Sequence, residues 1–218
     1  MLRVGLTGEL GSGKSTVARM LGARGAIILS SDEMGRDMMR PGQAVCQQIV
    51  AHFGEGILAA DKTIDRSKLA RIAFDPAHPR VEELNAIVHP AVLSAQAGQI
   101  AEIARTQPDV VVVIESALIF STKHSGKNPW RDRFDRIVVV TAPEEQKLAR
   151  FVTRATVGRP LSTEARRALE VDARQRLVQQ QIAPGQSAGC IIIHNEGNIL
   201  ELEAQVDKVW NELCTDAA

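Results

Sequence analysis

The sequence predicts an α/β protein in which a parallel sheet of five strands is flanked by helices. Five short apolar runs rich in Val and Ile are typical of strands that are buried on both faces of such a sheet. The runs are Leu2–Thr7, Ala26–Leu29, Val110–Ile114, Arg136–Thr141 and Cys190–His194. Helical patterns alternate with them, and this alternation of β and α units predicts a parallel sheet wrapped by helices. The helical patterns cover Lys14–Arg24, Val45–Phe53, Arg66–Phe74, Val81–Arg105, Pro143–Thr153 and Ile199–Leu213.

Two stretches are longer than a simple connection between strands requires. Residues 33–108 are almost wholly helical in pattern, and we expect them to form a helical insertion over one edge of the sheet. A second, polar stretch at about residues 154–176 is a candidate lid. Its arginines are Arg154, Arg159, Arg166, Arg167, Arg174 and Arg176. We expect the 218 residues to form one domain that carries both excursions.

The composition limits the class of partner. The 26 basic and 26 acidic residues cancel, so no overall field attracts nucleic acid or an anionic membrane, and an anion site must be built locally. The three cysteines are far apart and form no CxxC pair, which argues against a disulfide framework or a zinc site. Because the chain has no room for a signal peptide before its first glycine turn and no apolar run of membrane-spanning length, we expect it in the cytoplasm. The sequence leaves the oligomeric state open.

A glycine-rich turn, GELGSGKST, follows the first predicted strand. Residues Gly8–Ser15 fit the pattern G-x-x-x-x-G-K-[ST] and open a predicted helix, which is the context that a phosphate-binding loop requires. Its glycines let backbone N–H groups converge on an anion, and the helix N-terminus adds partial positive charge. Lys14 supplies a charge for the β- and γ-phosphates, and Ser15 a hydroxyl for bound Mg²⁺. The turn therefore predicts a site for a nucleoside triphosphate.

Three classes of triphosphate-binding protein compete at this point. A switch GTPase would carry D-x-x-G after the third strand and N-K-x-D after a later one, and neither is found there. A motor ATPase usually has a strand that ends in an acidic pair, whereas Val110–Glu115 ends in a single Glu, which weakens this reading without removing it. A small-molecule kinase needs an acceptor pocket, a carboxylate for the acceptor hydroxyl and arginines that cover the transferred phosphate.

The chain offers candidates for each part of a kinase. Asp32 follows the second predicted strand, and the carboxyl end of that strand should lie at the same edge of the sheet as the phosphate turn. The competing interpretation makes Ser31 or Asp32 the N-cap of a helix that starts at Glu33. Arg36 lies one helical turn after Asp32 and should face the same side.

The candidate lid arginines have two interpretations. A lid that closes over ATP would exclude the water that otherwise takes the phosphoryl group. A solvated helical surface accounts equally well for most of these arginines. It accounts less well for Arg150 and Arg154, which lie one turn apart after the fourth strand.

Several segments resemble the dephospho-coenzyme A kinases over nearly the whole chain. GLTGELGSGKSTVA is similar to the family's opening GLTGGIGSGKSTVA, and SSDEMGRDMMRPG resembles its D-A-D-x-x-x-R segment closed by Pro-Gly. The segments AHFG, IDRSKLARIAF, LNAIVHPAV and IIIHNEG then follow in the family's order. Shikimate kinases would show Gly-Gly-Gly after the third strand, where this chain has ESALIF.

The resemblance implies a P-loop kinase fold and transfer of the ATP γ-phosphoryl group to the ribose 3′-hydroxyl of dephospho-coenzyme A, with Mg²⁺ bound. It makes the helical insertion the acceptor-binding subdomain. The implied catalytic residues are Lys14, Asp32 and Arg154, and the implied acceptor-binding residues are Asp32, Arg36 and His89. The implied nucleotide-binding residues are Gly8, Gly11, Ser12, Gly13, Lys14, Ser15, Thr16 and Arg150. Another small-molecule or nucleoside kinase, or an ATP-binding regulatory module, remains the alternative.

The chain departs from the family pattern at three places. Ser30 stands where the family often has its first Asp, and Ala117–Ser121 replace a common P-L-L-F-E segment, with Glu115 as the candidate to replace the lost Glu. Glu9 replaces a glycine inside the phosphate turn. Because a carboxylate near a triphosphate is unfavourable, we expect the Glu9 side chain to point into solvent.

Overall fold

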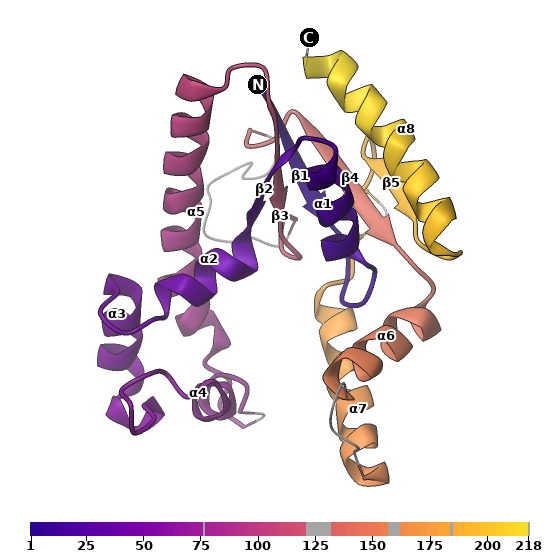
Figure 1. Cartoon of the computed structure of the whole chain (residues 1–218). Helices are drawn as coiled ribbons and strands as arrows, with labels where there is room; N and C mark the ends of the chain where they lie inside the picture. The colour runs from indigo at the N-terminus through magenta and orange to yellow at the C-terminus, as the bar shows by residue number, and fades with distance from the viewer. Residues whose placement is uncertain (76, 121–131, 157–161, 184, 218) are drawn as a thin grey trace. The chain divides into compact units, whose positions relative to one another are not determined.

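The computed structural model describes residues 1–75, 77–120, 132–156, 162–183 and 185–217 (Figure 1). These residues fall into two compact units. The first contains Met1–Leu29 and the described residues from Ala104 onward, and the second contains Ser30–Ile103. None of the helices within the described ranges has the length and apolar character that a membrane span requires.

The first unit contains a five-stranded sheet in the order β2-β3-β1-β4-β5. The strands are β1 (Leu2–Thr7), β2 (Ile27–Ser30), β3 (Val111–Glu115), β4 (Arg136–Thr141) and β5 (Ile191–His194). β1 pairs in parallel with β3 on one side and with β4 on the other, and β4 pairs in parallel with β5. The structure confirms the predicted α/β class, and each strand lies within one residue of the predicted run. Strands buried on both faces select continuous β-branched runs, which explains why the sequence signal was clear.

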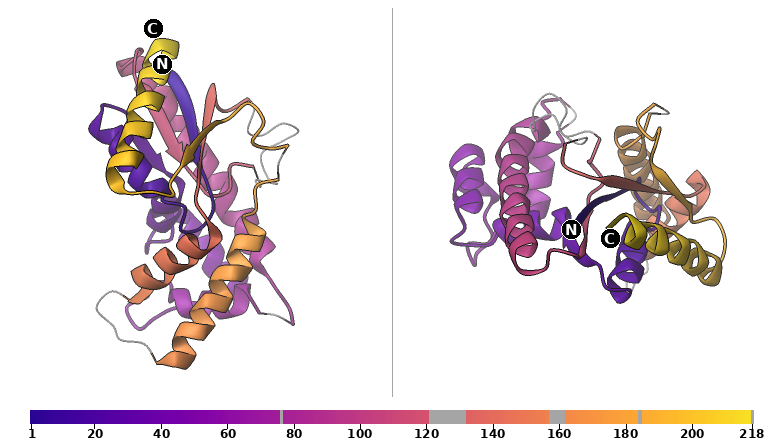
Figure 2. Two further views of the ribbon diagram at one scale, coloured as in Figure 1. Left: turned by 90° about the vertical axis from the view of Figure 1, so that its right-hand side faces the viewer. Right: turned by 90° about the horizontal axis from the view of Figure 1, so that it is seen from above.

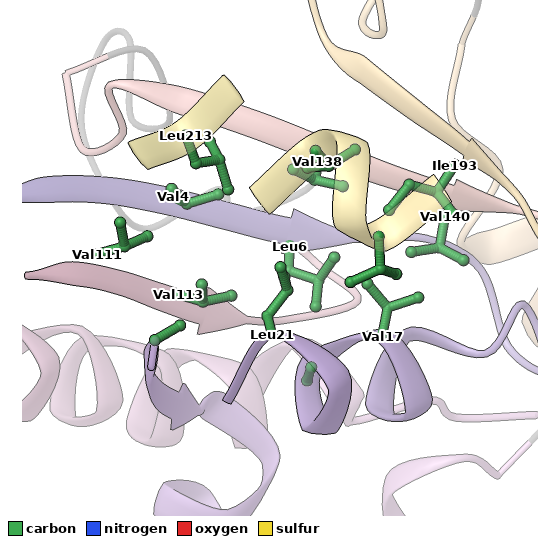
Figure 3. Close-up of a cluster of buried hydrophobic side chains, with 14 of the residues drawn as sticks. Val4, Leu6, Val17, Leu21, Val111, Val113, Val138, Val140, Ile193 and Leu213 are labelled. Atoms are coloured by element: carbon green, nitrogen blue, oxygen red, sulfur yellow. The ribbon is translucent and has the colours of Figure 1, made fainter. Parts of the chain in front are cut away.

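Two helices cover one face of this sheet, namely α1 (Lys14–Ala23) and α8 (Ile199–Ala217). Figure 3 shows Val17 and Leu21 of α1 and Leu213 of α8 pointing into a cluster of strand residues. The strand residues are Val4, Leu6, Val111, Val113, Val138, Val140 and Ile193. Burial of each such side chain contributes about 1.5–3 kcal/mol. This packing holds the carboxyl ends of β1, β4 and β5 in place, and the phosphate turn begins directly after β1.

Two further helices of the first unit are α6 (Glu144–Thr156) and α7 (Thr163–Gln179), which lie next to each other (Figures 1 and 2). α7 occupies much of the stretch that the sequence marked as a candidate lid. It begins after Ser162, whose side-chain oxygen accepts a hydrogen bond from the backbone N–H of Ala165 at 3.2 Å. Such N-cap bonds satisfy a backbone donor that the helix itself leaves unpaired. The candidate lid residue Arg159 lies outside the described residues.

The second unit is helical. Its elements are α2 (Ser31–Met38), α3 (Ala44–Phe53), the short 3₁₀ helix η1 (Glu55–Ile57), α4 (Arg66–Ala73) and most of α5 (Val81–Thr106). α3, η1 and α4 bury a core of their own, which includes Ile49, Phe53, Ile57 and Leu69. Asp65 caps α4 by accepting hydrogen bonds from the backbone N–H groups of Ser67 and Lys68. The helices predicted at 45–53, 66–74 and 81–105 are all present.

A charged cluster joins α3 to the start of α5. Glu83 accepts two-point hydrogen bonds from Arg80, at 2.7 and 3.0 Å to Oε2, and lies 2.5 Å from Nε2 of His52. The Arg80 guanidinium also lies over the Phe53 ring, 4.6 Å from its centroid. Hydrogen bonds from Arg80 and then from His52 lower the pKa of Glu83 from 4.5 to about 2. The ionised form of Glu83 therefore stabilises this part of the second unit.

We expect this contribution to be lost in acid. A carboxylate whose pKa is lowered by folding stabilises the protein above its unfolded pKa and loses that effect as the pH falls through its folded value. Hydrogen exchange of the α3 and early α5 amides should therefore be slower in the wild type than in Glu83→Gln near pH 6. The difference should shrink between pH 4.5 and about 2. A difference that stays constant over this range would show that Glu83 acts through packing and not through its charge.

Candidate active site

The phosphate turn joins β1 to the N-terminus of α1. Gly13 is the N-cap of α1 and has a left-handed backbone, with φ of 98°. A Cβ atom at Gly13 would lie 2.2 Å from Nδ2 of Asn195, so only glycine fits there. No side chain caps α1 at this residue. The first N–H groups of α1 are thus directed at a place where an anion can bind.

Lys14 lies at the first position of α1. Its Nζ is 3.3 Å from the backbone carbonyl oxygen of Glu9, and the Ser12 N–H donates to the same oxygen at 3.1 Å. The turn is therefore closed on itself, with the ammonium group beside its first residues. This arrangement suits a cation that contacts the β- and γ-phosphates of a nucleotide held by the loop.

Ser15 contacts an acidic residue of the next strand. Its hydroxyl donates to Oε1 of Glu115 at 2.7 Å, and Glu115 is the last residue of β3. Because β1 pairs with β3, the end of β3 lies beside the phosphate turn. A hydroxyl and one carboxylate match the few protein oxygens that Mg²⁺ takes when the substrate phosphates and water supply its other ligands. Glu115 is thus a suitable partner for the metal, whereas Ser121 lies outside the described residues.

Asn195 and Arg150 brace the turn from the other side. Asn195 follows β5, and its Nδ2 donates to the carbonyl oxygen of Ser12 at 2.8 Å in a buried position. Arg150 of α6 holds Asn195 through a hydrogen bond from Nη2 to the Asn195 carbonyl at 3.0 Å. Its Nη1 is buried and has no hydrogen-bond partner among the described residues. The sequence marked Asn195 only as part of the segment IIIHNEG, which resembles a late strand with Asn in the dephospho-coenzyme A kinases, and its contact with Ser12 was not predicted.

The expected orientation of Glu9 is wrong. Only 21% of its side chain is exposed, and its carboxylate forms an ion pair with Lys147 of α6. From the sequence we expected the Glu9 side chain to point into solvent, which would keep its negative charge away from the phosphates. The structure instead supplies a nearby cation, which the sequence could not indicate because Lys147 lies 138 residues away.

The cap proposed for α2 is also corrected. The N-cap is Ser30, whose hydroxyl accepts from the backbone N–H of Glu33 at 3.4 Å. Ser31 and Asp32 are already helical residues, so neither is the cap. A serine caps a helix about as well as an aspartate, which makes the departure at Ser30 harmless to the start of α2.

Asp32 lies exposed in the first turn of α2. Its carboxylate makes no hydrogen bond within the described part of the chain, so it is available to a ligand. Arg36 donates from Nε to the backbone oxygen of Asp32 at 3.1 Å, which places the two residues on one side of α2. His89 lies half-buried in α5, directly before Pro90. These three predicted acceptor residues all belong to the second unit.

Of the candidate lid arginines, Arg159 lies outside the described residues, Arg167 is exposed in α7, and the other four divide into two groups. Three are ion-paired on the helix surface, in the pairs Arg166–Glu170, Arg176–Asp172 and Arg174–Glu144. The exposed positions of these three arginines agree with the interpretation of the stretch as a solvated helical surface. Arg154 is exposed in the last turn of α6 and makes no hydrogen bond or ion pair with another described residue. Gln180, which ends α7, accepts from the Leu10 N–H at 2.8 Å and so ties this helix to the phosphate turn.

Comparison with known proteins decides between the classes of enzyme. Residues 2–200 match the sequence model of the dephospho-CoA kinases. The chain belongs to the dephospho-CoA kinase family. A dephospho-CoA kinase of Geobacter metallireducens is 38% identical over 213 residues, which cover 97% of this chain and 96% of the relative. One of Syntrophus aciditrophicus is 36% identical over 98% of this chain and 83% of the relative.

Solved structures agree with this fold. The crystal structure of TT1252 from Thermus thermophilus is 25% identical, with a TM-score of 0.69 over 97% of both chains. The resemblance to dephospho-CoA kinases that the sequence motifs indicated is therefore confirmed, and so is the P-loop kinase fold. Family membership favours the kinase over the GTPase and motor ATPase alternatives.

Proposed function

We propose that this dephospho-CoA kinase family member transfers the γ-phosphoryl group of ATP to the ribose 3′-hydroxyl of dephospho-coenzyme A, giving coenzyme A and ADP. This is the last step of coenzyme A synthesis, and we assign it to the cytoplasm. The observation that carries the proposal is the family match over residues 2–200. The phosphate turn supports it, because its backbone, Lys14 and Ser15 form a site for a nucleotide.

The nucleotide side of the reaction belongs to the first unit. The turn from Gly8 to Thr16 binds the phosphates through backbone N–H groups other than those of Leu10, Ser12 and Thr16, which donate to Gln180, Glu9 and Gly13. Lys14 stabilises the charge on the β- and γ-phosphates. Arg150 holds Asn195 against the Ser12 carbonyl, and its buried Nη1, which has no hydrogen-bond partner among the described residues, is the donor that we assign to the nucleotide. Arg154, one turn later, covers the phosphates and helps to exclude water from them.

Ser15 and Glu115 would hold Mg²⁺. When bound, the metal neutralises charge on the β- and γ-phosphate oxygens. The hydrogen bond of 2.7 Å between the two side chains brings both oxygens to one place before any ligand arrives. Such a site needs few protein ligands, because the substrate phosphates and water supply the others.

Replacement of Glu115 by Gln tests this metal site. The amide keeps the shape and a hydrogen bond to Ser15 but removes the negative charge, so we expect about a tenfold higher Mg²⁺ concentration for half-maximal activity. Turnover should recover in part at high Mg²⁺. Glu144→Gln, on the exposed face of α6, is the matched control. An unchanged Mg²⁺ dependence of Glu115→Gln would remove Glu115 from the metal site.

The acceptor side of the reaction belongs to the second unit. Asp32 accepts the proton of the 3′-hydroxyl as its oxygen attacks the γ-phosphorus in line with the leaving ADP oxygen. One O–P bond forms to the ribose, and the bond from the γ-phosphorus to the β,γ-bridging oxygen breaks. Arg36 and His89 bind the acceptor. The free carboxylate of Asp32 and the position of Arg36 on the same side of α2 support these roles.

The test is a coupled measurement of ADP release from ATP and Mg²⁺, with and without dephospho-coenzyme A. We expect release to depend on the acceptor, and the product mass to rise by one phosphate. Slow release that is independent of the acceptor would contradict the assigned substrate. It would leave the nucleotide site intact and direct the search to nucleosides and protein partners.

A further inference from the structure

Lys147 contacts the phosphate turn at two points. Its side chain forms the ion pair with Glu9, the second residue of the turn. Its backbone lies against Gly11, where an added Cβ atom would come within 2.2 Å of the Lys147 carbonyl oxygen. Lys147 therefore contacts the turn both through an ion pair and through close backbone packing. Within the described ranges, Lys147 is also the one charged residue that is buried, with 9% of the whole residue exposed.

Glu9 brings a negative charge close to the predicted phosphate site. The carbonyl oxygen of Glu9 lies 3.3 Å from Nζ of Lys14, so the backbone of Glu9 borders that ammonium group, and its carboxylate is carried by a residue of the phosphate turn itself. The side chains of Lys147 and Glu9 are only 11% and 21% exposed. Water therefore screens this charge incompletely, and an uncompensated carboxylate would repel a triphosphate.

We propose that Lys147 is a positioning residue for ATP, which acts by cancelling the negative charge of Glu9 in the phosphate turn. With Lys147 present, the side chains of Lys14, Glu9 and Lys147 together carry one positive charge. Without it, the charges of Glu9 and Lys14 cancel, and the attraction for phosphate falls to that of the backbone N–H groups of the turn together with Arg150 and Arg154 of α6. The inference rests on the proposed binding of ATP to this turn, and it explains how a carboxylate is accommodated there.

The test measures the dissociation constants of ATP, ADP and AMP, with Mg²⁺ and without acceptor, by calorimetry. Lys147→Met keeps the apolar stem and removes the charge. Because repulsion grows with the charge of the ligand, we expect Kd to rise about tenfold for ATP, about threefold for ADP and less than about twofold for AMP. The increase for ATP should shrink at high salt.

Two further variants separate charge from packing. Glu9→Gln removes the repulsive charge and leaves Lys147 positive, so we expect ATP to bind about threefold more tightly. The double variant Glu9→Gln with Lys147→Met should return the Kd for ATP to within about threefold of the wild type. Lys208→Met, at an exposed position of α8, is the matched control and should change none of these constants.

A purely structural clamp gives a different pattern. If the ion pair only holds α6 against the turn, both single variants and the double variant should raise the Kd for ATP, ADP and AMP by the same factor. This result would overturn the proposal. Glu9→Gln keeps the test decisive even if Lys147→Met fails to fold, because weaker ATP binding by Glu9→Gln would also overturn it. A wild-type protein that binds no ATP would instead contradict the proposed function.

Discussion

Replacing Asp32 by Asn should lower kcat for phosphorylation of dephospho-coenzyme A by about a thousandfold, within the range that loss of a catalytic proton acceptor produces. The amide is close to the carboxylate in size but takes up no proton from the attacking hydroxyl. ATP affinity should stay near the wild-type value, because the nucleotide binds to the first unit. The measurement is the coupled ADP assay at saturating substrates, with ATP binding measured separately.

The same helix supplies a control for this variant. Asp37 lies later in α2 and pairs with Arg40 at 2.8 Å, at exposed positions. Asp37→Asn makes the same chemical change outside the proposed site, and we expect kcat to remain unchanged. Because Asp32 is exposed and is not the N-cap, its replacement should leave α2 folded. If turnover of Asp32→Asn equals that of the wild type, Asp32 takes no part in the chemistry.

Replacing Lys14 by Ala should impair both binding and turnover. Lys14 supplies a charge that contacts the phosphates before reaction and stabilises the charge on the transferred group during it. We expect the Kd for ATP to rise at least tenfold, or about 1.4 kcal/mol, and kcat to fall about a hundred- to a thousandfold. Calorimetry with ATP and the coupled assay measure the two effects independently.

Lys208→Ala makes the matched change on the exposed surface of α8 and should leave both constants unaltered. The Lys14 variant itself should remain folded, because removing a cation from the N-terminus of α1 does not weaken that helix. Normal ATP binding and normal turnover in Lys14→Ala would contradict the assignment of residues 8–15 as the phosphate site.

Local signals explain what was predictable here. In the central strands β1, β3 and β4 consecutive residues are buried, so these strands are continuous apolar runs rich in Val and Ile. Such runs can be recognised without knowing their neighbours. The phosphate turn is likewise a set of adjacent residues between a strand and a helix. The start of α2 shows the limit of local signals. Ser30, Ser31 and Asp32 can all cap a helix, and the choice depends on the residue at which the chain leaves β2.

The sequence by itself determined the α/β class, the five strands and six of the helices, the nucleotide-binding turn and the resemblance to dephospho-coenzyme A kinases. It did not identify α7 as a helix, because the polar stretch at 154–176 has no apolar periodicity that marks one. Only the tertiary structure decided which side chains support that turn. Glu115 meets Ser15 across 100 residues, Lys147 meets Glu9 across 138, and Asn195 meets Ser12 across 183. These contacts arise because the sheet order places β3 and β4 on either side of β1, with β5 beyond β4. The ends of distant strands thus converge on one loop. The spacing of residues along the chain does not predict which of them will be in contact there.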